Sequence, residues 1–241
     1  MSADRPAFYA LSPGGWRDWW TLLHPPYTLW HLSYVALGAA TVPEVDLYRL
    51  GMTLLGFFLG VGLAAHALDE LRGRPLGTAI PDRVLQALAV VSLIGAAAIG
   101  VIGIVQVSPW LAVFIAAGTF LVVAYNLELA GGAFHSDLWF ALAWGGFPAL
   151  TGAFAQDGTL SVAAVLVAAA CVAISAAQRV LSTPVRRLRR RVEAVEGTIT
   201  LRDGETEALD ADAIRAAPEA ALKLLSIAMP VLAAGAVLAR L

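Results

Sequence analysis

The sequence has few charged residues, a single cysteine and no recognisable leader. Only 14% of the 241 residues are charged, whereas soluble domains average about 25%. The formal net charge of −2 gives no sign of a nucleic-acid partner, so none is predicted. Cys171 lies in an apolar run, and a lone cysteine excludes an intrachain disulfide. The first residues lack a basic segment followed by an apolar run and a cleavage site, so we expect no cleavable signal peptide.

Long apolar runs dominate the sequence instead. Hydrophobic residues make up 59% of the chain, and apolar runs of about 18 residues or more are typical of helices that cross a bilayer. The sequence therefore predicts an all-α fold, a polytopic membrane helical bundle with about seven transmembrane helices. The predicted spans are residues 27–43, 50–68, 84–105, 109–127, 138–155, 160–180 and 219–239.

The spans divide the chain into four predicted regions. These are residues 1–26, an interfacial N-terminal helix; 27–180, a six-span membrane bundle; 181–218, a cytoplasmic basic segment; and 219–241, the seventh span. Trp16, Trp19 and Trp20 stand beside charged residues, and indole rings favour the headgroup layer of a membrane. This mixture predicts a short helix lying on the bilayer.

The basic segment opens with five arginines between residues 186 and 191. One interpretation is an anchor on anionic lipid, worth about 1 kcal/mol per basic residue near the surface. The other is a basic lid over an anionic substrate. Further on, 198–201 and 206–209 flank Asp203-Gly204, a pair that suits tight turns, so a small hairpin is predicted there.

The distribution of basic residues predicts the orientation of the chain. Of 16 lysines and arginines, only Arg49 and Arg240 fall on the side of the membrane opposite the N-terminus. Basic residues gather on the cytoplasmic side of membrane proteins. We therefore expect an integral, multi-pass membrane protein with a cytoplasmic N-terminus and a C-terminus on the opposite side.

Polar and ionisable residues gather at the predicted cytoplasmic ends of the spans. Ionisable groups at membrane depth cost about 2.5–3.5 kcal/mol each on insertion scales, so they usually face a cavity that they serve. His66, Asp69 and Glu70 share one face of a helix because residues three and four apart are neighbours. The ends of spans two, four and six are expected to meet at one cavity. The candidate residues are His24, His31, His66, Asp69, Glu70, Tyr125, Asn126, Glu128, His135 and Asp137.

Several of these residues also have an ordinary structural explanation. Ser136 or Asp137, just before an apolar helix, is a suitable N-cap. Asp69 and Glu70 can pair with Arg72 and Arg74 at the surface. The alternative is that these arginines bind phosphate oxygens beside a carboxylate-held metal, which is a common way to bind a diphosphate.

Short motifs resemble the UbiA-type family of intramembrane prenyltransferases. The stretch His-Pro-Pro-Tyr-Thr-Leu at 24–29 resembles the start of that family's first span, and Ala-His-Ala-Leu-Asp at 65–69 lies where the family has Asn-Asp-x-x-Asp. Arg-Pro-Leu at 74–76, followed by Gly77 and Ile80, is similar to its Arg-Pro-Leu-x-x-Gly-x-Ile stretch. The remaining points of resemblance are Tyr125-Asn126, Gly145, Gly146 and Gly152.

The resemblance covers about residues 20–180 and implies a helical bundle. It also implies that the bundle binds an isoprenyl diphosphate through Mg²⁺ at two Asp-rich motifs. The prenyl group would then be transferred to an aromatic or lipid acceptor. The chain departs from the family at the second motif, because residues 177–182 contain no acid. The family also has nine spans, two more than the sequence predicts here.

The first hypothesis is therefore a divergent UbiA-like enzyme that binds an isoprenyl or other lipid diphosphate through Mg²⁺ and arginines and transfers the prenyl group. Its predicted catalytic and metal-binding residues are Asp69, Glu70 and His66. Its predicted substrate-binding residues are Arg72, Arg74, Tyr125, Asn126 and Arg179.

Two other hypotheses fit the sequence. One is an intramembrane metalloenzyme that binds iron, zinc or manganese, because imidazole suits transition metals whereas Mg²⁺ prefers oxygen. Its ligands would come from His24, His31, His66, Asp69, Glu70, Glu128, His135 and Asp137. The other is a non-catalytic lipid-binding or partner protein on a decayed prenyltransferase fold, which the missing acidic motif favours. The lipid bilayer is a partner in every case, and the sequence predicts no oligomeric state.

Overall fold

The computed structural model describes residues 5–241, which are mostly helical. The helices are α1 (Trp16–Leu23), α2 (Pro25–Ala39), α3 (Leu47–Phe57), η1 (Phe58–Ala65), α4 (His66–Leu71), α5 (Asp82–Gln106), α6 (Leu111–Asn126), α7 (Leu129–Gly132), α8 (Asp137–Ala141), η2 (Leu142–Gly146), α9 (Phe147–Asp157), α10 (Val162–Arg191) and α11 (Ala211–Leu238). The strands are β1 (Thr198–Thr200) and β2 (Thr206–Ala208). The segments η1 and η2 are π-helical, and each lies inside a longer helix.

The protein is a multi-pass membrane protein. Within residues 5–241, five helices are long and apolar enough to cross a bilayer. They are Leu47–Leu71, Asp82–Gln106, Asp137–Asp157, Val162–Arg191 and Ala211–Leu238. The predicted spans 27–43 and 109–127 correspond to α2 and α6, which have 15 and 16 residues. A straight crossing needs about 20 residues, so the count of seven stays a prediction.

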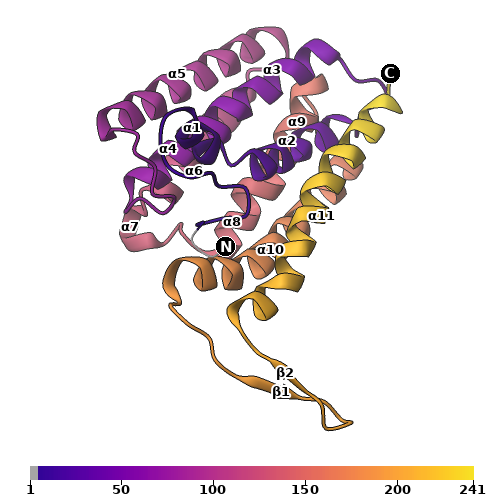
Figure 1. Cartoon of the computed structure of the whole chain (residues 1–241). Coiled ribbons are helices and arrows are strands. Elements are labelled where there is room, and N and C mark those ends of the chain that lie inside the picture. The colour runs from indigo at the N-terminus through magenta and orange to yellow at the C-terminus, as the bar shows by residue number, and fades with distance from the viewer. Residues whose placement is uncertain (1–4) are drawn as a thin grey trace.

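Helix α2 forms the centre of the bundle, between α9 and α11 (Figure 1). Trp30 and Tyr34 of α2 have no exposed surface, and the indole Nε1 of Trp30 donates a 2.7 Å hydrogen bond to the Tyr34 hydroxyl. This bond satisfies the indole N–H inside the core, where an unpaired donor would be costly. Helix α2 is therefore largely enclosed by the other helices of the protein.

Small residues bring α2 and α9 into backbone contact. A Cβ atom added to Gly152 would collide with the backbone carbonyl of Val35, and one added to Gly38 would collide with the backbone of Ala149. Close crossing at small residues is a common way for membrane helices to pack, because it maximises van der Waals contact. The two glycines therefore set the distance between α2 and α9.

We expect Gly152→Ala to lower the free energy of unfolding by about 1–3 kcal/mol, the range for overpacked cores. The obstructing atoms belong to the Val35 backbone, so no side-chain rotation relieves the contact. Gly51→Ala is the matched control, because a Cβ at this helical position meets nothing within 4 Å. Denaturant unfolding of both variants in mixed micelles checks the difference. Equal stability of the two variants would contradict a close α2–α9 crossing.

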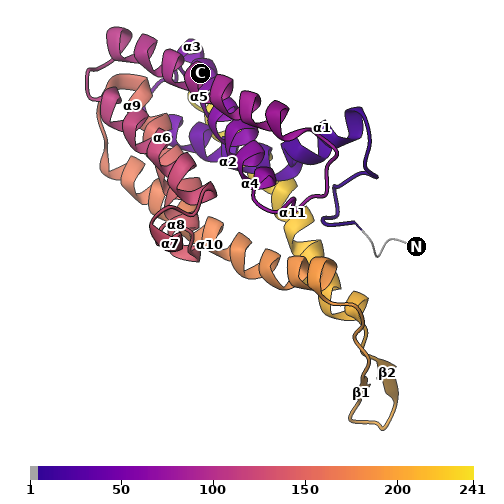
Figure 2. The ribbon, with the colours of Figure 1, turned by 90° about the vertical axis from the view of Figure 1, so that its left-hand side faces the viewer.

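Helices α10 and α11 continue beyond the rest of the bundle and are joined by the hairpin of β1 and β2 (Figures 1 and 2). The hairpin is antiparallel, with Thr198 opposite Ala208 and Thr200 opposite Thr206, which confirms the predicted turn at Asp203-Gly204. Much of the region 181–218 is helical, because α10 extends to Arg191 and α11 begins at Ala211. At 1.5 Å per residue, the 30 residues of α10 measure about 45 Å, longer than the hydrocarbon core of about 30 Å.

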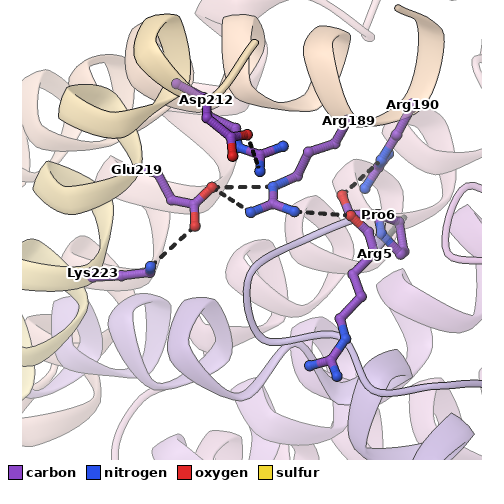
Figure 3. A network of polar contacts seen from close by, with 8 residues as sticks. Arg5, Pro6, Arg189, Arg190, Asp212, Glu219 and Lys223 are labelled. Atoms are coloured by element: carbon purple, nitrogen blue, oxygen red, sulfur yellow. Dashed lines mark hydrogen bonds and ion pairs between the residues drawn. The ribbon is translucent and has the colours of Figure 1, made fainter. Parts of the chain in front are cut away.

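A polar network fastens α10 to α11 and to the N-terminal segment (Figure 3). Two guanidinium nitrogens of Arg189 donate to Glu219, at 2.6 and 3.1 Å, and Lys223 approaches the other carboxylate oxygen at 3.1 Å. Arg189 also donates to the carbonyl of Arg5, and Arg190 donates to the carbonyl of Pro6. The network holds the N-terminal segment against the end of the bundle where α10 ends, which we call the arginine-rich end.

The predicted interfacial helix corresponds to α1. Its residues Trp16, Trp19 and Trp20 are exposed, while Asp18 and Thr21 are buried against the preceding loop. The Asp18 carboxylate accepts a hydrogen bond from the Gly14 amide, and the Thr21 hydroxyl accepts one from Leu11. Residues 1–4 of the predicted N-terminal region lie outside the described residues. Three exposed indoles fit the predicted position at a membrane surface.

Candidate functional site

A polar cavity of about 540 Å³ opens at the arginine-rich end of the bundle. Its walls come from the N-terminal segment, α2, η1, α4 and the loop after it, the end of α6, the loop before α8, α8 itself, η2 and α10. The polar and aromatic residues that line it are Tyr9, His24, Tyr27, His31, His66, Asp69, Arg72, Tyr125, Asn126, Glu128, His135, Phe140, Trp144, Gln178, Arg179, Ser182, Thr183, Arg186, Arg187, Arg190 and Arg191. The prediction that spans two, four and six end at one cavity is confirmed.

Helix α10 contributes a continuous polar face. The lining residues of α10 follow one another at spacings of one and three positions, which places them on a single stripe of the helix. Four guanidinium groups, those of Arg186, Arg187, Arg190 and Arg191, extend this stripe to the end of the helix. Arg189 faces α11 instead. Four arginines of the basic run therefore border the cavity.

Three histidines are anchored through the same ring atom. Nδ1 of His31, His66 and His135 lies 3.0 Å from the carbonyl oxygens of Trp144, Gly62 and Tyr125, respectively. A carbonyl oxygen can only accept, so each Nδ1 carries a proton, and in the neutral form of each ring Nε2 is the nitrogen without one. This arrangement leaves Nε2 available to accept a proton or to bind a metal.

The π-helical segments explain how two of these anchors arise. Gly62 lies in η1 and Trp144 lies in η2. A π-helical turn shifts the backbone hydrogen bonds from i−4 to i−5, and such turns are frequent at functional sites. A backbone carbonyl that loses its usual N–H donor at such a shift can accept a hydrogen bond from a side chain. Here the two carbonyls fix the rings of His66 and His31 at the cavity wall.

His24 and His66 stack on each other in the cavity wall. Their ring centroids are 4.1 Å apart with an interplanar angle of 20°. Nε2 of His24 is buried and has no hydrogen-bond partner among the described residues. Burial and then the nearby His66 lower the pKa of His24 well below its ordinary value, so the ring is neutral near pH 7. Burial also raises the pKa of the neighbouring Tyr9 phenol, which therefore stays protonated.

Aromatic rings form the inner part of the cavity. Tyr125 stacks on His135 with centroids 4.4 Å apart, and it meets Trp144 edge to face at 5.6 Å. The guanidinium of Arg179 lies 5.1 Å from the centre of the Phe140 ring. Asn126 donates to the carbonyl of Val122, which fixes its amide at the wall. The predicted pair Tyr125-Asn126 therefore belongs to the cavity.

The cavity carries an excess of positive charge. Six arginines line it, against two carboxylates, those of Asp69 and Glu128. Glu128 is paired with Arg72 at 2.8 Å. Arg186, Arg187 and Arg191 form no ion pair with any residue in 5–241. Uncompensated charge beside apolar walls is unfavourable, so the cavity favours an anionic ligand.

Three predicted site residues do not line the cavity. Glu70 is completely buried, and its carboxylate accepts hydrogen bonds from the Leu76 amide and from the amide and hydroxyl of Thr78. Arg74 donates to the carbonyls at 78 and 80 and pairs with Asp82. These residues organise the 72–81 loop, which explains why a carboxylate and a guanidinium are placed there.

Asp137 is the third residue outside the cavity lining. Its carboxylate is 70% exposed and accepts from Arg179 at 2.7 Å, so it orients that arginine from outside. The residue that caps α8 is Ser136, whose hydroxyl accepts from the Trp139 amide. Asp137 therefore begins the helix without capping it.

The donor set of the cavity does not fit a carboxylate-held magnesium ion. Mg²⁺ prefers several oxygen ligands in an octahedral arrangement. Asp69 is the one lining carboxylate that is not engaged by an arginine, since Glu128 is paired and Glu70 is committed to the loop. Within residues 5–241, no three His, Cys, Asp or Glu side chains converge on one point where a metal ion could bind. Each histidine can therefore act alone, as one metal ligand or as a base. Among the described residues, the histidines do not form a preformed metal site.

An apolar groove of about 150 Å³ adjoins the cavity. It runs between α3, η1, α5, α6, η2 and α9, and it shares Val61 and Trp144 with the polar cavity. Most of its walls are aliphatic, aromatic or glycine residues. An amphipathic molecule can therefore place a polar head among the arginines and an apolar chain between the helices.

Sequence reasoning missed several lining residues. Tyr9 and Tyr27 come from the N-terminal segment and the first turn of α2. Gln178, Ser182 and Thr183 come from the middle of α10. The spacing of these last three with the arginines at 179 and 186 is a helical stripe, and that signal is present in the sequence. The position of Tyr9 depends on the fold of the N-terminal loop, for which the sequence has no comparable signal.

No family model, curated protein or solved structure matches the chain.

Proposed function

We propose that the protein is a divergent UbiA-like membrane enzyme that binds the diphosphate head of an isoprenyl or related lipid in the polar cavity and transfers the lipid group to an acceptor. The observation that carries the proposal is the junction of two cavities of opposite chemistry, with six arginines in one and hydrocarbon side chains in the other. A lipid diphosphate likewise combines a charged head with a hydrocarbon chain. The positive-inside rule places the arginine-rich end in the cytoplasm.

In the proposed reaction, the bond between the first lipid carbon and the diphosphate oxygen breaks, and its electron pair leaves with the diphosphate. Guanidinium groups stabilise the negative charge that develops on that oxygen. The lipid carbon then bonds to a nucleophilic atom of the acceptor, which loses one proton. The faces of Tyr125 and Trp144 suit an allylic cation. His66 is the proposed proton acceptor, because its Nδ1–H is held by Gly62 and its Nε2 is free.

The test uses purified protein in lipid nanodiscs with radiolabelled geranylgeranyl diphosphate and an extract of membrane lipids as acceptor. We expect the protein to retain the label and to produce a new labelled lipid together with free diphosphate. His66→Gln should slow transfer by about 10²- to 10⁴-fold, the usual contribution of a general base, without changing binding. Arg202→Gln, in the hairpin turn, is the control that should change neither. Failure of the wild-type protein to retain the label would refute the proposal.

A second candidate is a lipid-phosphate-binding protein without transferase activity. The shortage of free carboxylates in the cavity favours it, because prenyl transfer in the family that the sequence resembles depends on two acidic motifs. Retention of the labelled diphosphate with no labelled product, across a range of lipid and aromatic acceptors, would support this candidate over the enzyme.

A further inference from the structure

We infer that the arginines of α10 take the place of a divalent cation, so that the protein binds its lipid diphosphate without a metal ion; this inference rests on the proposed function. A diphosphate carries several negative charges and requires a matching positive charge. In the cavity that charge comes from guanidinium groups: the lining holds six arginines and two carboxylates.

All but one of the carboxylates predicted for the site are already engaged in other contacts. Glu70 is fully buried beneath the 72–81 loop and accepts three hydrogen bonds from it. Glu128 is paired with Arg72 at 2.8 Å. Asp69 remains without an ion-pair partner among the described residues, and a single carboxylate is a poor magnesium site.

The arginines of α10, in contrast, are available. Arg186, Arg187 and Arg191 form no ion pair within residues 5–241, and Arg190 makes a single 3.3 Å contact with the Pro6 carbonyl. Their positions at i, i+1, i+4 and i+5 place all four on one face of α10, at the cavity. A guanidinium binds phosphate oxygens through two parallel N–H donors, so neighbouring arginines can clamp a diphosphate from one side.

Asp69 distinguishes the two modes of binding. If a metal bridged Asp69 and the diphosphate, Asp69→Asn would remove a ligand and weaken binding. If arginines bind the diphosphate directly, the carboxylate of Asp69 repels it across the same cavity, and Asp69→Asn leaves the affinity unchanged or raises it. The two modes therefore predict different results for the same substitution: weaker binding if a metal bridges, and no weakening if arginines bind the diphosphate directly.

The experiment measures binding of geranylgeranyl diphosphate and of inorganic pyrophosphate by calorimetry, with nanodisc-embedded protein in excess EDTA and then in excess Mg²⁺. We expect the lipid diphosphate to bind equally well in both solutions and more tightly than pyrophosphate, because the groove adds apolar contact. Arg186→Gln should weaken binding by about 10- to 100-fold, the loss expected for a charge-assisted hydrogen bond. Arg187 is exposed, so Arg187→Gln provides a second test in which folding is not at issue.

Arg83→Gln is the matched control, because Arg83 is exposed at the start of α5 and outside the cavity lining, and it should leave affinity unchanged. Binding that disappears in EDTA and returns with Mg²⁺, or a loss of binding in Asp69→Asn, would overturn the inference while leaving the proposed function in place. Absence of binding in both solutions would instead overturn the proposed function, and the inference with it.

Discussion

Glu70→Ala is expected to lower the free energy of unfolding by about 3–5 kcal/mol, because three hydrogen bonds to a buried acceptor are lost together. The carboxylate of Glu70 lies 2.8–3.0 Å from the Leu76 amide and from the amide and hydroxyl of Thr78, and Glu70 has no exposed surface. The substitution leaves two buried N–H donors without acceptors. Glu70→Gln should be intermediate, because its amide has one acceptor oxygen and presents a donor where the second oxygen was.

The neighbouring acid supplies the control for this prediction. Asp69 lines the cavity and its carboxylate forms no hydrogen bond with another described residue, so Asp69→Ala should change stability by less than about 1 kcal/mol. Denaturant unfolding in mixed micelles measures both variants, and hydrogen exchange at the Leu76 and Thr78 amides reports on the loop. A larger loss for Asp69→Ala than for Glu70→Ala would show that the two acids have the opposite functions.

The difference between these two acids also shows where prediction from sequence stops. The spacing of His66, Asp69 and Glu70 places all three on one face of a helix, and this much follows from helical geometry. Helix α4 ends at Leu71, however, and the chain folds back so that the 76–78 backbone covers Glu70. The fold-back depends on a loop conformation, with Gly73 and Arg74 both at positive φ, that local sequence patterns do not specify.

Membrane helices were the most predictable part of the fold. Spans 50–68, 84–105 and 138–155 lie within helices long enough to cross the bilayer, and spans 160–180 and 219–239 lie within two more such helices apart from one or two residues at one end. Their prediction succeeds because hydrocarbon thickness fixes the length of an apolar run. The π-helical segments were not predicted, because a shift in backbone hydrogen bonding leaves no periodic signal in the side chains. These same segments supply the carbonyls that hold His31 and His66, so an important part of the site depends on them.

The arginine run illustrates a partial success. The sequence left two interpretations of 186–191 open, and helix α10 shows where each of these arginines lies. Four of the arginines share the stripe that begins with Gln178, whereas Arg189 lies on the other side and meets Glu219. A helical extension of the sixth span through residue 191 would have predicted this division. The predicted cytoplasmic segment began at residue 181, so the run was not placed on a helix.

The buried pair of Arg189 and Glu219 carries the second large expected effect. Their side chains are 4% and 9% exposed, and they join α10 to α11 (Figure 3). Glu219→Ala should lower the free energy of unfolding by about 3–5 kcal/mol, because it leaves a buried guanidinium without its counter-charge. Lys223→Ala removes the outer member of the same network, which is 53% exposed, and should cost no more than about 1 kcal/mol.

The double variant Arg189→Met/Glu219→Leu tests whether the unpaired guanidinium causes the loss of stability in Glu219→Ala. Both charges are removed together, so no buried charge is left unpaired, and stability should return to within about 1 kcal/mol of the wild type. The contact between Arg189 and the carbonyl of Arg5 is lost in this variant, so proteolysis of the N-terminal segment should become faster even though the bundle stays folded. Denaturant unfolding and limited proteolysis separate these two effects. A double variant as unstable as Glu219→Ala would mean that the pair contributes through its attraction, and that the cost of leaving one charge unpaired is minor.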